Sequence, residues 1–60
     1  MTVILYSLLS ATHIRLENVE QIEAGQHKMN GHLSNVWFML INGHSKVFQQ
    51  KHYQIERIHQ

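Results

Sequence analysis

The alternation of apolar and polar positions divides the chain into short segments with the periodicity of β-strands. The clearest segment is 36–49, in which the unbroken apolar run Val36 to Ile41 is followed by Asn42-Gly43 and a second run. An Asn-Gly pair between two such runs favours a type I′ turn, because both residues tolerate positive φ. The sequence therefore predicts a β-hairpin that turns at Asn42-Gly43.

This turn also predicts the pairing of the two strands. A two-residue turn places Ile41 opposite His44 and Trp37 opposite Phe48. Because side chains alternate across a sheet, both faces of the hairpin are apolar. One face carries Val36, Phe38, Leu40 and Val47, and the other carries Trp37, Met39, Ile41 and Phe48. A strand that is apolar on both faces is usually covered on both, by its own chain or by a partner. The pattern leaves open which face is the internal core.

The run from Thr2 to Leu9 is a second candidate for a two-sided strand, since both of its alternating sets are mostly apolar. We expect it to pair with the strand 36–41, within the chain or across a dimer axis. A helix is the alternative, because Leu5 and Leu8 have helical spacing. The run has no basic flank and is too short to span a bilayer, which favours a strand over an export signal.

Residues 12–24 allow two interpretations. Polar and apolar positions alternate up to Asn18 and restart out of phase after it, which predicts two short strands joined by a tight turn over 16–19. The alternative is one amphipathic helix that ends at Gly25. Strands are favoured, because Ile14 and Ile22 fall off the stripe that the other apolar positions would form on a helix.

The remaining segments complete a small domain. Residues 25–35 form a loop, or a second hairpin turn at Asn30-Gly31 if the preceding strand continues. Residues 51–60 carry Tyr53, Ile55 and Ile58 and could close an edge of the sheet. The predicted fold is therefore a single small domain over 1–60, all-β or β-rich α+β, with one antiparallel sheet of four to five short strands around the hairpin at Asn42-Gly43.

Composition indicates how so short a chain could be stabilised. A domain of 60 residues buries only about 60% of the surface of its unfolded chain and usually needs disulfides, a metal or self-association. The chain has no cysteine, so self-association as a homodimer is the expected reinforcement. A net charge of +1 gives no field strong enough to define a nucleic-acid or membrane protein.

The residues that could carry chemistry do not form a known motif. The histidines are His13, His27, His32, His44, His52 and His59. Their spacings match no metal signature, so we predict neither a metal site nor a cofactor. The chain also lacks aspartate, a nucleophile elbow and a phosphate-binding loop. The sequence therefore predicts a protein that is not an enzyme.

These observations favour a small protein-binding module that acts as a homo-oligomer in the cytoplasm, with itself and an unidentified protein as partners. Compact chains without catalytic residues or an export signal are often inhibitors or adaptors that phages and mobile elements direct at host proteins. The residues expected at the interface are the second apolar face and two tyrosines: Trp37, Met39, Ile41, Phe48, Tyr6 and Tyr53.

The alternative function is binding of single-stranded RNA or DNA by a small β-barrel. Aromatic and cationic residues alternate after the central turn, as on surfaces where bases stack between phosphate-binding cations. The candidate residues are Lys46, Phe48, Lys51, Tyr53 and Arg57.

Overall fold

The computed structural model describes residues 1–58. This part of the chain contains six strands and no helix, which confirms the all-β form of the predicted fold and excludes the helical alternatives for 2–9 and 12–24. The strands are β1 (Thr2–Ser7), β2 (His13–Leu16), β3 (Val19–Met29), β4 (His32–Ile41), β5 (His44–Gln49) and β6 (Tyr53–Ile58).

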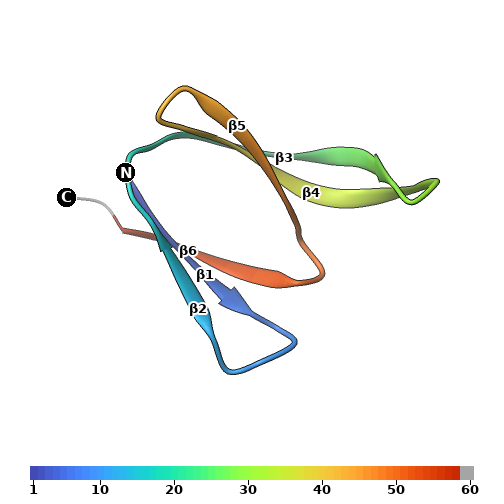
Figure 1. Cartoon of the computed structure of the whole chain (residues 1–60), viewed down its shortest axis with the longest axis horizontal. Helices are drawn as coiled ribbons and strands as arrows, with labels where there is room; N and C mark the ends of the chain where they lie inside the picture. The colour runs from blue at the N-terminus through green and yellow to red at the C-terminus, as the bar shows by residue number, and fades with distance from the viewer. Residues whose placement is uncertain (59–60) are drawn as a thin grey trace.

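The strands form two antiparallel sheets of three strands each, in the orders β2-β1-β6 and β3-β4-β5. Figure 1 shows the two sheets facing each other, joined by the β2–β3 connection on one side and by the β5–β6 turn on the other. The sequence predicted one sheet of four to five strands. The difference arises at Asn18, whose positive φ of 58° redirects the chain from the first sheet into the second.

Both Asn-Gly pairs form hairpin turns. Asn42 and Gly43 have φ values of 50° and 78°, and Ile41 pairs with His44 and Trp37 with Phe48, so the predicted turn and register are confirmed. Asn30-Gly31 has the same backbone geometry, with φ values of 51° and 80°. It joins β3 to β4 directly, so 25–35 is a hairpin and not an irregular loop.

The predicted strand near the start of the chain is confirmed over Thr2–Ser7, but its predicted neighbour was wrong. Strand β1 pairs with β2 and β6 and not with β4. The reason is that β4 already pairs with β3 on one side and β5 on the other, each through a two-residue turn. Local pairing of this kind leaves β4 no edge for a distant strand.

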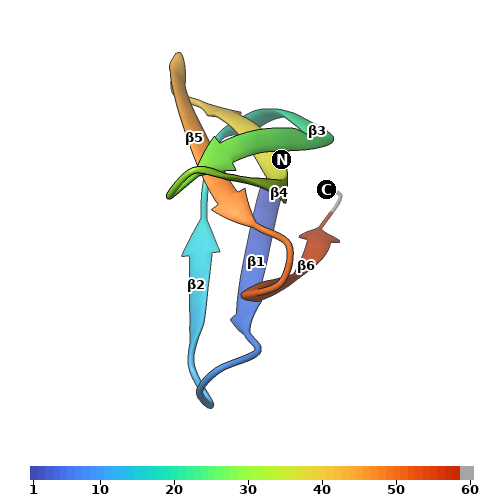
Figure 2. The same cartoon turned by 90° about the vertical axis from the view of Figure 1, so that its right-hand side faces the viewer.

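The core lies between the two sheets (Figure 2). It is built around Val3 and Leu5 of β1, Met39 and Ile41 of β4, and Val19 at the start of β3, all of which are buried. The sheets also meet through backbone hydrogen bonds, because Met1 N donates to Val19 O (2.7 Å) and Val19 N donates to Met1 O (2.9 Å). The internal face of β4 is therefore the one that carries Met39.

Candidate functional site

The predicted interface residues of the central hairpin lie on its internal face. Met39 is 1% exposed and Ile41 is 8% exposed, and both contact the opposite sheet within the core. Trp37 and Phe48 pack against that core and are half-buried. The burial has a simple cause, since this face of the hairpin is covered by the chain's own first sheet. Only Trp37 and Phe48 of this face keep surface that a partner could contact.

The other face of the same hairpin points outward. Phe38 and Leu40 of β4 are half-buried there, and Val47 of β5 is 37% exposed. Val36, which alternation places on the same side, is fully buried. The apolar face that was expected to carry Val36, Phe38, Leu40 and Val47 is thus the outer one, and it is partly open to solvent.

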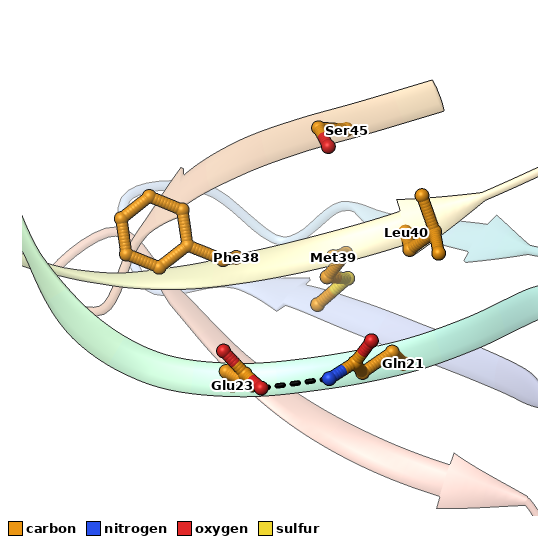
Figure 3. A pocket seen from close by; sticks show the side chains of 6 residues that line it. All are labelled: Gln21, Glu23, Phe38, Met39, Leu40 and Ser45. Carbon is orange, nitrogen blue, oxygen red and sulfur yellow. Dashed lines mark hydrogen bonds between the residues drawn. The ribbon is translucent and has the colours of Figure 1, made fainter. Parts of the chain in front are cut away.

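A hollow of about 180 Å³ opens on this outer face. Figure 3 shows the side chains that line it, which come from all three strands of the sheet: Gln21 and Glu23 from β3, Phe38, Met39 and Leu40 from β4, and Ser45 from β5. Gln21 Nε2 donates a hydrogen bond to Glu23 Oε1 at 2.7 Å. The hollow therefore combines apolar walls with a carboxylate held in place by its neighbour.

A second, more polar groove of about 480 Å³ lies where the β5–β6 turn meets β4, lined by Leu33, Ser34, Asn35, Gln50 and Lys51. Gln50 holds the turn in position, because its backbone N donates to Asn35 O (3.0 Å) and its Nε2 donates to Val36 O (3.0 Å). Lys51 is exposed. This groove presents hydrogen-bonding groups and one cation.

Two aromatic residues flank the β5–β6 turn that carries Lys51, one at the end of each strand. Phe48 and Tyr53 pack edge to face with ring centroids 5.9 Å apart, and His52 makes a similar contact with Tyr53 at 6.5 Å. Three of the predicted nucleic-acid residues, Phe48, Lys51 and Tyr53, are therefore close together. Arg57 lies four positions along β6 from Tyr53, about 13 Å away at the rise of an extended strand. Lys46 is exposed on β5.

Tyr6 and Tyr53, the two tyrosines predicted at the interface, lie on different surfaces. Tyr6 is 40% exposed on the outer side of the first sheet, where its hydroxyl donates to Glu56 Oε1 at 3.3 Å. Partial burial, and then the negative charge of Glu56, raise the pKa of Tyr6 above its ordinary value. Tyr53 instead packs against the core between the sheets. The two side chains therefore belong to separate surfaces.

Strands β5 and β6 each have an edge that pairs with no other strand of residues 1–58. The type I′ turn makes Ile41 and His44 a hydrogen-bonded pair, so the backbone groups of Val47 and its alternate neighbours point away from β4. On the other side of the turn, Leu8 N donates to His52 O at 2.8 Å, so the backbone of His52 points toward β1. Because hydrogen-bonding direction alternates along a strand, the backbone groups of Tyr53 and Ile55 point away from β1. The β5–β6 turn therefore joins two edge strands, and each strand has unpaired backbone hydrogen-bonding groups that point away from its own sheet.

The histidine and glutamate side chains of residues 1–58 form no metal-binding cluster. Within residues 1–58, no three side chains of the metal-binding types lie close enough together to hold an ion. His59 lies outside the described residues. Glu17 has a clear role in the fold, because hydrogen bonds from Arg15 and from Thr2 Oγ1 lower the pKa of its carboxyl and tie the β2–β3 break to β1.

Comparison with known proteins gives no relative. No protein-family model, no curated protein and no solved structure matches the chain. Residues 1–58 also contain no helix that is long and apolar enough to cross a membrane.

The sequence interpretation missed the polar lining of both surfaces. Glu23, Gln21 and Ser45 were assigned no role, although a second turn at Asn30-Gly31 would have placed Glu23 opposite Phe38. The expected pairing of Glu23 with Phe38 was therefore the one signal in the sequence for a carboxylate on this apolar face. The groove beside Gln50 had no such signal, because it depends on how an irregular turn folds back against β4.

Proposed function

We propose that this protein is a non-enzymatic protein-binding module that acts as a homo-oligomer, and that copies associate by pairing β5 of one copy with β6 of another. The observation that carries the proposal is the pair of six-residue edges with outward backbone groups. An unpaired edge with apolar side chains is a template for strand addition by another chain. The exposure of Val47, at 37%, makes β5 such an edge.

Charge supports pairing between unlike edges. Two β5 edges would bring the exposed Lys46 side chains of both copies together, and like charges across a strand pair are destabilising. Strand β6 carries one charge of each sign, Glu56 and Arg57, so it can offer Lys46 an opposite charge where Glu56 lies beside it. Because each copy has both a β5 edge and a β6 edge, such contacts form a closed dimer or ring if the rotation between copies closes, and a filament if it does not. The core of the single domain is small, so self-association would also stabilise it.

The wider biological role follows the expectations from the sequence. We expect the assembly to act in the cytoplasm, since the chain has no cysteine for disulfides. A partner would be a protein whose surface is occupied by the assembly, in the manner of a phage-encoded inhibitor or adaptor. Tyr6 and the exposed parts of Trp37, Phe48 and Tyr53 remain the residues of the predicted interface that a partner could contact.

Solution mass tests the proposal directly. We would measure light scattering from 5 to 500 µM, on the order of the range in which weak and strong interfaces separate. The wild type should have a mass above that of one chain, and Val47→Lys should shift it toward the monomer by adding a charge to the edge. Leu33→Lys is the matched control, because Leu33 is 71% exposed at the opposite hairpin tip.

The outcomes separate clearly. A wild type that stays a monomer over the whole range would reject the homo-oligomer. If the wild type is a multimer and its solution mass is unchanged in both Val47→Lys and Leu33→Lys, then β5 is not the interface. Far-ultraviolet circular dichroism of both variants distinguishes dissociation from unfolding.

A second candidate function is binding of single-stranded RNA or DNA. The observations that favour it are the polar groove lined in part by Lys51 and the contact between the rings of Phe48 and Tyr53, which flank the same turn in the sequence. Stacking on aromatic rings beside a cation binds single strands with little sequence preference. Fluorescence anisotropy with a twelve-nucleotide oligouridine should then give an affinity that falls with salt and with Lys51→Ala, whereas Lys28→Ala, on the other hairpin, should have little effect. No binding at about 50 mM salt would exclude this function.

A further inference from the structure

We infer that the hollow on the outer face of the second sheet binds the side chain of a lysine or arginine from a partner protein. The hollow is lined by Gln21, Glu23, Phe38, Leu40 and Ser45, with the backbone of β4 as its floor (Figure 3). Gln21 and Glu23 lie on β3 and Phe38 and Leu40 on β4, so of these residues Ser45 alone belongs to the β5 edge. The site therefore has its own ligand chemistry.

Size limits the ligand to a single side chain. The hollow measures about 180 Å³, whereas pockets for small-molecule ligands usually measure about 300–1,000 Å³. An open depression of this size on a sheet suits one protruding residue of another polypeptide. This agrees with a protein as the partner.

Charge selects a cation. Glu23 is the charged residue of the lining, and its Oε1 accepts from the Gln21 amide, which is a neutral donor. Among the residues that the structure describes, the one ion pair joins Arg15 to Glu17, so no cation of the same chain neutralises Glu23. The Glu23 carboxylate therefore lies beside an apolar wall without a cationic partner among residues 1–58, which is the complement of a positively charged group.

The apolar wall favours a long cationic side chain over a small ion. Lysine and arginine carry methylene stems that lie on apolar surface while the charged group reaches a polar one. Phe38 and Leu40 supply that surface, and Glu23 and the Ser45 hydroxyl lie at the rim as acceptors. The ring of Phe38 adds attraction for a cation placed over its face.

This inference rests on the proposed protein-binding function for its natural partner, but it concerns a different surface. Short peptides test it without any need for self-association. Peptide binding to the wild type reports on the hollow whatever the oligomeric state of the protein, and a hollow that binds nothing would leave the edges of β5 and β6 unaffected. The two proposals can therefore fail separately.

The experiment is a titration of the ¹⁵N-labelled full chain with capped tripeptides, followed by amide chemical shifts. The central residue is lysine, arginine, norleucine or glutamate, between two glycines. We expect saturable shifts at Glu23, Leu40 and Ser45 with the lysine and arginine peptides. Norleucine keeps the stem without the charge and should bind up to about fivefold more weakly, since an exposed charge contact contributes up to about 1 kcal/mol.

Two variants locate the charge effect. Glu23→Gln should weaken the lysine peptide about fivefold, whereas Glu56→Gln, which removes the same charge from the first sheet, should leave the affinity unchanged. The inference is overturned if norleucine and lysine peptides bind equally, if no shift saturates, or if both variants weaken binding equally. The comparison of peptides on the wild type decides the question even if Glu23→Gln does not fold.

Discussion

The ring of Phe38 lies directly over Gly25 of the neighbouring strand. A Cβ built at Gly25 would be 2.8 Å from Cε2 and 3.2 Å from Cδ2 of that ring, closer than side chains normally approach. The ring of Phe38 also lies nearly perpendicular to the ring of His27, at an interplanar angle of 87° with centroids 6.0 Å apart. The glycine thus lets the aromatic side chain lie flat along the outer face of the sheet, and this holds one wall of the hollow.

Gly25→Ala should therefore destabilise the protein, although alanine is ordinarily the better residue in a strand. Displacing the ring costs about 1–3 kcal/mol as overpacking, and the reduced entropy of the unfolded chain offsets up to about 1 kcal/mol of that. We expect a net loss of about 1 kcal/mol in the free energy of unfolding, measured with urea.

The same substitution in a Phe38→Leu background provides the control. Leucine lacks the ring atoms that meet the new Cβ, so the cost of Gly25→Ala should largely disappear there. An equal cost in both backgrounds would mean that the close approach does not cause the loss.

The central turn gives a second prediction. Gly43 has a φ of 78° and no heavy atom within 4 Å of a built Cβ, so Gly43→Ala should cost only the strain of its backbone, about 1 kcal/mol. Gly31 has a φ of 80° and the same open surroundings, so Gly31→Ala should cost a similar amount. Urea unfolding of both variants checks this, and a large difference between them would show that the Glu20 contact to Gly43 N (3.1 Å) matters more than backbone strain.

How far the sequence could predict this fold depends on the range of the interactions involved. The hairpin at Asn42-Gly43 and its register followed from two adjacent residues, and the structure confirms both. The neighbours of β1 are set by contacts with residues far along the chain, such as Leu5 with Ile55, for which the sequence has no local signal. The apolar alternation of Thr2–Leu9 could predict a strand but not its partners.

The candidate sites follow the same rule. Alternation alone predicted that the hairpin has two apolar faces, but it could not say that Met39 faces inward and Phe38 outward. That choice depends on which face the first sheet covers, and hence on the Asn18 bend and on the Met1 and Val19 hydrogen bonds. The expected interface at Met39 and Ile41 is part of the core for this reason.

Trp37 allows the role of its indole nitrogen to be separated from that of its ring. Its Nε1 is buried and has no hydrogen-bond acceptor within residues 1–58, while the ring packs against the core. Trp37→Ala should cost about 3 kcal/mol, because it removes a large side chain from the core. Trp37→Phe keeps an aromatic ring and removes an N–H that is not hydrogen-bonded, so it should cost about 1 kcal/mol. Thermal unfolding at matched concentration compares the two, and equal losses would mean that Nε1 has a partner.

The carboxyl of Glu17 should make stability depend on acid. Hydrogen bonds from Arg15 and Thr2 lower the pKa of Glu17 in the folded protein below the ordinary value of 4.5. A group whose pKa is lowered by folding stabilises the folded state above its unfolded pKa, and this contribution is lost as pH falls through the folded pKa. The wild type should therefore have a higher urea midpoint than Glu17→Gln at pH 7, and the difference should shrink as the pH is taken below 4.5.

Arg15→Gln should remove part of the same difference, because it removes the largest cause of the lowered pKa of Glu17. A midpoint difference between wild type and Glu17→Gln that stays constant down to the acid range would contradict a role for the charged carboxylate at the β2–β3 break.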